Sequence, residues 1–385
     1  MEIRKEIESL LDEIIENRRY LHQHPEIELN TLKTKNYIKK QLKSYGYQDF
    51  DESLLTNSLV VDLKVNTNPS AIAFRSDIDA LPTKEATGVD FASQNGFSHA
   101  CGHDGHMSAL LATAHFMINH RDQLKENIVL IFQPGEESPG GAQTMIANGL
   151  FDKHPARYIF GTHLMGNVDA GKIGCKSGPQ MARNGEVDIV VEGKSAHGAM
   201  PELGKDAIVA ASDLIMRFQE IKHFDEDPMK KTVLTIGTIN GGQARNVVSD
   251  RIEMHGTMRA YSDVLYEQLK ADIMRVSKEV ETKYGVKVNS VVEDYYLVVD
   301  NDEYLHDVLK HVLKEDYELA PAKMIAEDFS FYQREIPGLF FNTGVRDETH
   351  QANIHDADFN FDEAALLNTV ETNIRLLEAL GVIDD

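Results

Sequence analysis

Residues 71–79 of the chain read Ala-Ile-Ala-Phe-Arg-Ser-Asp-Ile-Asp, an apolar run that ends in charged residues. A short apolar run of this kind predicts a strand that is buried on both faces. Similar runs recur at residues 59–65, 128–132, 157–161 and 339–342. Helical periodicity is found at residues 3–21, 31–45, 105–119 and 363–380. Strands that alternate with helices predict an α/β fold, in which a mixed, mostly parallel sheet is flanked by helices.

The middle of the chain has a different order of elements. After about residue 185 the pattern reads strand, helix, strand, strand, helix, strand, at residues 186–192, 206–220, 232–239, 251–260, 264–284 and 287–294. This order is typical of a ferredoxin-like α+β domain. A chain of 385 residues is also longer than one hydrophobic core usually serves. We therefore expect a first domain of residues 1–180 plus 295–385, and an inserted domain of residues 181–294.

The composition excludes several classes of protein. A net charge of −23 argues against a nucleic-acid partner, because binding phosphates needs clustered Lys and Arg. No apolar run approaches the roughly 18 residues of a membrane span, so no membrane partner is expected. The first residues predict a charged helix and not the apolar core of a signal peptide. Two cysteines are too few for a disulfide framework. We expect a cytoplasmic protein.

Polar side chains follow four of the predicted strands at their carboxyl ends. They are Arg75, Asp77 and Asp79 after the first strand, Gln133, Glu136 and Glu137 after the next, Thr162 and His163 after the third, and Thr343 after the last. In an open α/β sheet, ligands bind beyond the carboxyl ends of the strands. The carboxyl edge of the sheet is therefore the predicted functional site.

The run at residues 99–106, His-Ala-Cys-Gly-His-Asp-Gly-His, lies between two of those strands. The thiolate of Cys101 and the imidazole of His103 suit zinc or a similar first-row metal. An isolated Cys-x-His is more often chance or packing, and adjacent carboxylates such as Glu136 and Glu137 more often form a solvated acidic turn. Their positions at neighbouring strand ends, together with His163, favour a metal site. One of the two carboxylates would bind metal and the other would be a general base.

Seven motifs together carry a resemblance to a known family. They are RRYLHQHPE at residues 18–26, RSDIDALP at 75–82, ACGHDGH at 100–106, QPGEE at 133–137, GKSAHGAMP at 193–201, GGQARNVV at 241–248 and NIHDADF at 353–359. ACGHDGH is the most specific of them. The chain resembles, nearly from end to end, the amidohydrolase branch of the M20 metallopeptidase family. That branch includes hippurate hydrolases, N-acetyldiaminopimelate deacetylases and plant auxin-conjugate hydrolases.

The resemblance implies a zinc-exopeptidase-like catalytic domain with two divalent metal ions per subunit, either zinc, manganese, cobalt or nickel. On the matching positions, Cys101 would bridge the two ions. His103 and His163 would complete one ion site, and Glu137 and His355 would complete the other.

The resemblance also implies roles for residues that do not bind metal. Glu136 would be the general base, and Asp79 would be a carboxylate behind the ligands. His197, in the inserted domain, would polarise the scissile carbonyl or stabilise its oxyanion. Asn246 and Arg259 would hold a carboxylate of the substrate, Arg259 through its bidentate guanidinium. Other histidines, including His106, receive no role.

The reaction expected from the resemblance is hydrolysis of an N-acyl amino acid to a carboxylic acid and a free amino acid. An aminopeptidase or a dipeptidase with the same two-metal site is the nearest alternative. A catalytically idle metal-binding protein is another, although pure binding needs no general base such as Glu136. The inserted domain is expected to close over the site as a lid and to form a homodimer. Whether His197 acts within its own subunit or across the dimer stays open.

Overall fold

The structure, a computed structural model, describes residues 1–68, 70–222 and 227–384, and it divides into two compact units. The first unit comprises Met1–Gly178, Asp300–Pro321 and Asp328–Asp385, and the second comprises Pro179–Val299 and Ala322–Glu327. The predicted inserted domain, residues 181–294, does not include the segment 322–327. That segment belongs to the second unit because its backbone is hydrogen-bonded there. The amide of Lys323 donates to the carbonyl oxygen of Gln180 at 2.9 Å, for example.

The first unit is built on an eight-stranded sheet with the order β1-β2-β4-β3-β5-β16-β6-β15. Its strands are β1 (Phe50–Asp51), β2 (Leu59–Leu63), β3 (Ala71–Asp77), β4 (Asn127–Gln133), β5 (Tyr158–Asp169), β6 (Ile173–Cys175), β15 (Tyr317–Leu319) and β16 (Gly338–Arg346). Neighbours β4, β3, β5 and β16 run parallel, whereas β1, β2 and β4 pair antiparallel. The mixed, mostly parallel sheet confirms the predicted fold class.

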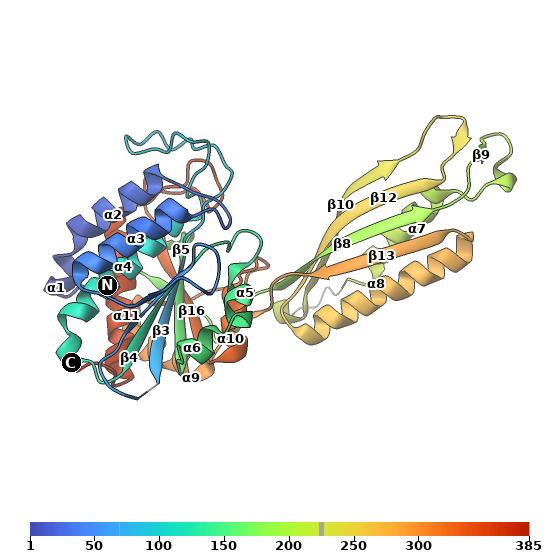
Figure 1. Cartoon of the computed structure of the whole chain (residues 1–385). Coiled ribbons are helices and arrows are strands. Elements are labelled where there is room, and N and C mark those ends of the chain that lie inside the picture. Colours follow the sequence, from blue (N-terminus) through green and yellow to red (C-terminus); the bar gives the residue numbers. More distant parts are fainter. Residues whose placement is uncertain (69, 223–226, 385) are drawn as a thin grey trace. The chain divides into compact units, whose positions relative to one another are not determined.

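Helices cover both faces of this sheet, as Figure 1 shows. On one face lie α1 (Lys5–Glu8), α2 (Leu11–Gln23), α3 (Leu32–Tyr45), α4 (His103–Asn119) and α11 (Leu366–Ala379), with α9 (Glu303–Leu313) against α11. On the other lie α5 (Gly141–Ala147), α6 (Leu150–Lys153) and α10 (Phe329–Glu335). Most residues of α4 are buried between the sheet and the outer helices. A helix that is largely apolar on all sides, as α4 is after its first turn, belongs in a core.

Two predicted elements differ from the observed ones. The helix predicted for residues 3–21 is broken between α1 and α2, where the Ser9 hydroxyl donates to the carbonyl oxygen of Glu6 at 2.7 Å. A serine bond of this kind competes with the helical backbone pattern. The strand predicted for residues 157–161 continues as β5 to Asp169, because its pairing with β16 continues past Thr162. His163 therefore lies within the strand and not beyond its end.

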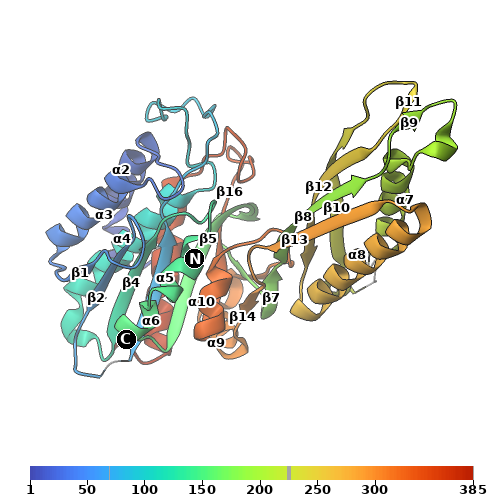
Figure 2. The same ribbon diagram turned by 45° about the vertical axis from the view of Figure 1, so that its right-hand side comes forward.

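The second unit contains a four-stranded antiparallel sheet with the order β10-β12-β8-β13. Its strands are β8 (Arg183–Glu192), β10 (Thr232–Gly241), β12 (Arg251–Ala260) and β13 (Lys287–Asp294), and its helices are α7 (Ala207–Glu220) and α8 (Asp263–Tyr284). Both helices pack on one face of the sheet (Figure 2). Asp206 and Ser262 cap their N-termini by accepting backbone N–H bonds. The strands and helices follow the predicted β-α-β-β-α-β order.

Short elements complete the chain. They are β7 (Gly178–Met181), β9 (Ala196–His197), β11 (Val247–Val248) and β14 (Val299–Asn301), with 3-10 turns at Arg121–Gln123, Pro201–Leu203, Pro228–Lys230, Lys314–Asp316 and Glu363–Ala365. Within the described residues, no helix combines the length and the apolar character needed to cross a membrane.

Candidate metal centre

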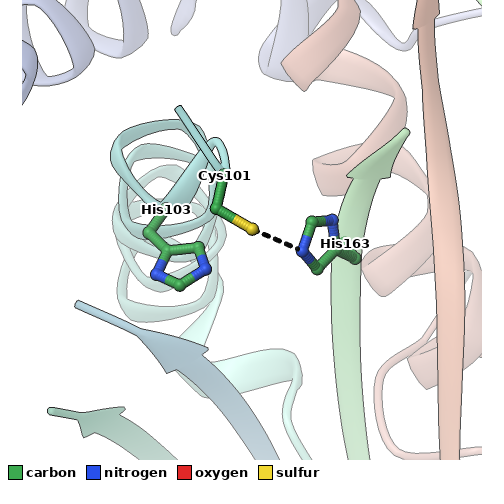
Figure 3. A group of neighbouring side chains, drawn as sticks. All are labelled: Cys101, His103 and His163. Atoms are coloured by element: carbon green, nitrogen blue, oxygen red, sulfur yellow. Dashed lines mark hydrogen bonds between the residues drawn. The ribbon is translucent and has the colours of Figure 1, made fainter. Parts of the chain in front are cut away.

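Three of the predicted ligands meet where the N-terminus of α4 approaches β5. Cys101 precedes the helix, His103 begins it, and His163 faces both from the strand (Figure 3). The Sγ atom of Cys101 lies 3.3 Å from Nε2 of His163. The three side chains are buried, and one potential ligand atom of each lies within 4.8 Å of the others. Their spacing is that of a metal-binding group.

Two glycines allow this close approach of α4 to β5. Gly102, which precedes the helix, has a φ of +84°, a conformation that favours glycine. At Gly105, a Cβ atom would lie 2.6 Å from Cδ1 of Leu164 and 2.8 Å from Cζ of Phe361. A side chain at this position would force Leu164, Phe361 or the helix itself to shift. The two glycines in the 99–106 run thus allow Cys101 and His103 to lie close to His163.

Hydrogen bonds to backbone carbonyls orient both histidine ligands. Nδ1 of His103 lies 2.8 Å from the carbonyl oxygen of Asp79, and Nδ1 of His163 lies 2.7 Å from that of Leu164. A carbonyl oxygen can only accept, so each Nδ1 carries the proton and each Nε2 keeps a lone pair, which at His163 faces Sγ of Cys101. Nε2 of His103 is buried and has no hydrogen-bond partner among the described residues. A backbone partner on the second nitrogen is the usual arrangement of a metal-binding histidine.

The turn that carries Glu136 and Glu137 follows β4 and is held by Asp79. The carboxylate of Asp79 is buried and accepts the backbone N–H of Glu136 at 3.0 Å and that of Glu137 at 3.1 Å. Ligand atoms of His103, Glu136 and Glu137 lie within 4.8 Å of one another. Asp79 thus positions the two glutamates through its side chain and His103 through its carbonyl group. The alternative of a solvated acidic turn does not fit, because Glu136 is only 6% exposed.

His355 reaches the same place from the loop after β16. Its Nε2 lies 3.3 Å from Oε1 of Glu137, and its backbone N–H donates to the carbonyl oxygen of Ala100 at 2.8 Å. Ligand atoms of Cys101, Glu137 and His355 form a second compact group. His355 has a φ of +71°, which costs about 1–3 kcal/mol for a residue with a side chain. Its side chain is 53% exposed, so this is the open side of the centre within the first unit.

The electrostatics of the cluster fit a bound cation. Burial raises the pKa of the Cys101 thiol well above its usual value, and the nearby carboxylates of Glu137 and Glu136 raise it further. Burial lowers the pKa of His103, and it lowers that of His163 well below the usual value. A divalent cation favours a thiolate and neutral imidazoles, and it balances the carboxylates. The donor set therefore matches the ion that the sequence predicts.

Three further predicted site residues lie in the second unit. His197 in β9 and Asn246 before β11 are exposed neighbours, since Val247 pairs with His197. Arg259 is half-buried near the other end of the sheet, where it pairs with Asn184 of β8 and donates to the carbonyl oxygen of Met324 at 2.6 Å. Strand β8 ends at Glu192, from which the chain continues to β9 and His197. The distance along β8 from Asn184 to Glu192 is about 26 Å. Asn246 and Arg259 of one chain therefore cannot hold one carboxylate together.

A buried ionic network behind the metal ligands was not assigned from the sequence. Nε of Arg18 donates to Oδ2 of Asp104 at 2.9 Å, and Nδ1 of His22 lies 2.8 Å from the same oxygen. Nε2 of His22 lies 2.9 Å from Oε1 of Glu85. Arg18 and His22 are four residues apart on α2, so they share one face of the helix, and this spacing was the available signal. The network ties α2 to the residue that follows His103.

Comparisons with known proteins give consistent matches over almost the whole chain. The profile of peptidase family M20/M25/M40 matches residues 73–379. An N-acetyl-L-cysteine deacetylase of Bacillus subtilis strain 168 is 35% identical over 382 residues, covering 97% of this chain and 90% of that protein. An N-acetyldiaminopimelate deacetylase of Exiguobacterium sibiricum is 36% identical over 355 residues, covering 91% and 95%.

Solved structures show the same similarity. A candidate aminohydrolase from methicillin-resistant Staphylococcus aureus has a TM-score of 0.91 and 32% identity, with 98% of each chain covered. A Bacillus subtilis protein described as a dinuclear metal-binding peptidase of the M20 family has a TM-score of 0.85 and 29% identity, with 97% of this chain and 99% of that one covered.

Proposed function

Since this chain belongs to peptidase family M20/M25/M40, we propose that it is a metal-dependent hydrolase that cleaves the amide bond of N-acyl amino acids. The products are a carboxylic acid and a free amino acid. One observation carries the proposal. Two compact groups of ligand atoms, one with His103 and His163 and the other with Glu137 and His355, share the thiol of Cys101. The names of the two deacetylases that are 35% and 36% identical point to N-acetyl amino acids as the first substrates to test.

Two divalent ions per subunit, either zinc, manganese, cobalt or nickel, fit these two groups. Cys101 would be the ligand common to both ions, and each ion would have one further pair of ligands, His103 with His163 and Glu137 with His355. A mixed set of thiolate, imidazole and carboxylate suits these borderline metals. Bound divalent ions lower the pKa of a water molecule and act as Lewis acids towards the amide oxygen.

Glu136 is the proposed general base. It is buried beside Glu137, and the backbone bond to Asp79 holds it in place. A carboxylate at this position takes a proton from the attacking water and passes it to the leaving amine nitrogen. Glu137 differs from it because its side chain is paired with His355. This ion pair places Glu137 in the second ligand group, and the resemblance to the family assigns the role of base to Glu136.

A homodimer is proposed from the second unit. Strand β10 is at the edge of its sheet, and Ile239 on it is 51% exposed. On α7, Ile208, Val209 and Met216 are 46%, 47% and 65% exposed. Exposed apolar side chains beside an open sheet edge are typical of an interface. The unit is also the proposed lid, with its hinge at the predicted boundaries near residues 180 and 295.

The dimer also gives a role to the separated residues of the second unit. Because Arg259 lies far along the sheet from His197 and Asn246, one substrate contacts both places only if two subunits contribute. We therefore place His197 and Asn246 of one subunit with Arg259 of the other. In these positions His197 stabilises the oxyanion, and Asn246 and Arg259 bind the substrate carboxylate. Both cysteines are free, in keeping with the proposed cytoplasmic location.

The test combines metal analysis with a substrate panel. Wild-type protein should contain about two divalent ions per chain and should hydrolyse N-acetyl amino acids faster than dipeptides with a free amino terminus. Preference for the free amino terminus would favour an aminopeptidase or dipeptidase instead.

Glu136→Gln should keep its metal and lose about 10²–10⁴-fold in kcat, because the amide cannot accept the proton. Glu137→Gln is the matched control, and it should lose metal as well as activity. Loss of metal from Glu136→Gln alone would show that the two roles are reversed.

A further inference from the structure

His106 is a buried imidazole on α4 for which the proposed mechanism has no use. Its Nε2 accepts the backbone N–H of Leu164 at 2.9 Å, and its Nδ1 lies 2.7 Å from Oδ1 of Asp77. Because an amide N–H can only donate, Nε2 carries no proton, and Nδ1 donates to Asp77. Both nitrogens are therefore occupied. His106 cannot bind metal in this arrangement, although it lies close to His103 and Asp77.

The bond to Leu164 replaces a missing strand partner. Strands β3 and β5 pair in parallel only as far as Arg75 and Gly161. Beyond that point β5 continues along β16, and β3 continues along β4 to Asp77. The two central strands thus separate where the metal ligands lie. An unpaired amide of a buried strand is costly, and the ring of His106 satisfies it.

The same residue of β5 orients a proposed ligand. The carbonyl oxygen of Leu164 accepts the Nδ1 proton of His163 at 2.7 Å, which directs Nε2 of His163 towards Cys101. The N–H of Leu164 is thus bound by His106, and the carbonyl group of Leu164 in turn orients His163. A shift of this backbone changes where the His163 ring points.

Asp77, the hydrogen-bond partner of His106 on the other side of the ring, is itself held in place. Asp77 is fully buried, and Nη1 of Arg75 donates to its Oδ2 at 2.9 Å. A carboxylate fixed by arginine is a strong acceptor for the His106 proton.

We propose that His106 is a positioning residue of the metal centre. With Asp77 it holds the backbone of Leu164 and thereby aims Nε2 of His163 at the ion shared with Cys101 and His103. The inference rests on the proposed function, and it concerns one of the two ions only. The ion at Glu137 and His355 has no link to Leu164 in this chain of bonds. Loss of an outer-shell partner of a histidine ligand typically weakens metal binding by 10–100-fold.

Two substitutions separate the two bonds of the ring. In His106→Asn, the side-chain amide takes the place of Nδ1 and donates to Asp77, but it is too short to reach Leu164. In His106→Gln, Oε1 takes the place of Nε2 and accepts the N–H of Leu164. The control is His115→Asn on the same helix, because His115 pairs with Glu13 on α2, away from the metal ligands. All variants are made in the full chain, stripped of metal and titrated with Co²⁺.

The readouts are the two Co²⁺ affinities and the thiolate-to-cobalt absorption. We expect His106→Asn to bind one of the two ions about 10–100-fold more weakly and to show an altered absorption band. His115→Asn should stay within about threefold of wild type for both ions, and His106→Gln, which keeps the bond to Leu164 but loses the anchor at Asp77, should weaken the same ion by less than His106→Asn does. These results would support the proposal, because general damage to the fold would not spare one ion.

Two results would overturn it. One is unchanged affinity for both ions in His106→Asn, and the other is equal weakening of both ions in His106→Asn and His106→Gln. A wild-type chain that binds no Co²⁺ would instead refute the metal centre itself, and the inference with it. Binding to the wild type therefore distinguishes failure of the proposed function from failure of the role of His106.

Discussion

Replacing Asp79 by asparagine tests how the two glutamates are held. Each oxygen of the Asp79 carboxylate accepts one backbone N–H, that of Glu136 at 3.0 Å and that of Glu137 at 3.1 Å. Asparagine offers one oxygen acceptor, and its amide group would face the other N–H as a second donor. Leaving one buried N–H without a partner costs about 1–3 kcal/mol, so we expect a loss of about 2 kcal/mol. The first unit should therefore melt about 4–8 °C lower.

The same substitution should affect the metal ions unequally. His103 is oriented by the backbone carbonyl group of Asp79, which asparagine keeps. The ion at His103 and His163 should therefore bind as in the wild type, whereas the ion at Glu137 should bind more weakly. Misplacement of Glu136 by about 1 Å should lower kcat by about 10²-fold.

The assays for Asp79→Asn are thermal unfolding, metal content and kcat with an N-acetyl amino acid. Asp12→Asn is the control, since Asp12 is exposed in the first turn of α2 and should change the melting temperature by about 1–2 °C at most. A melting temperature and a kcat equal to those of the wild type would refute the reasoning. Equal loss of both ions would show that Asp79 supports the whole centre and not the turn alone.

Three further predictions concern the dimer, the pH dependence and the metal. Mixing inactive His197→Ala and Glu136→Gln subunits should restore about a quarter of wild-type activity, because half of the dimers then have one intact site; no recovery would place His197 in its own subunit's site. Nδ1 and Nε2 of His154 lie 2.8 Å from Asp62 and 3.1 Å from Asp51. Hydrogen bonds from Ser53 and His154 lower the pKa of Asp51 to about 2 against the effect of burial, and the aspartates raise the pKa of His154, also against burial. The aspartate contribution is present above its unfolded pKa of 3.8 and is lost towards pH 2, and the histidine contribution is full below 6.5 and is lost as pH rises through the folded value. Thermal unfolding should therefore show the largest destabilisation by His154→Asn between pH 3.8 and pH 6.5. A constant difference over the whole pH range would contradict this. Chelation should abolish hydrolysis and lower the melting temperature, and added Co²⁺ should restore both; retained activity in metal-free protein would contradict the metal centre.

The order of strands and helices could be predicted from local pattern. Apolar runs and helical periodicity placed the central strands and most of the long helices within a few residues. A buried strand gives a short apolar run, and a helix with one buried face repeats apolar residues every three to four positions. The polar residues after those runs indicated the site, because parallel strands end at one edge of the sheet. The extension of β5 past His163 was missed, since its partner β16 lies far along the chain.

The roles of individual histidines could not be predicted in the same way. His103 and His106 are three residues apart on one helix, and their local pattern does not distinguish them; only the family resemblance selected His103 as a ligand. Only the tertiary structure shows that His103 has a free Nε2, while both nitrogens of His106 are occupied. The same is true of Arg18 and Asp104, whose contact spans two distant helices.

The sequence by itself determined the fold class, the family resemblance and the set of residues from which a metal centre is proposed. These depend on residue type and local spacing, which the chain carries directly. The tertiary structure decided which nitrogen of each histidine is available, which carboxylate holds the Glu136 turn, and how far Arg259 lies from His197. Those properties depend on hydrogen bonds and strand register between distant segments, and such contacts form only when the chain is folded.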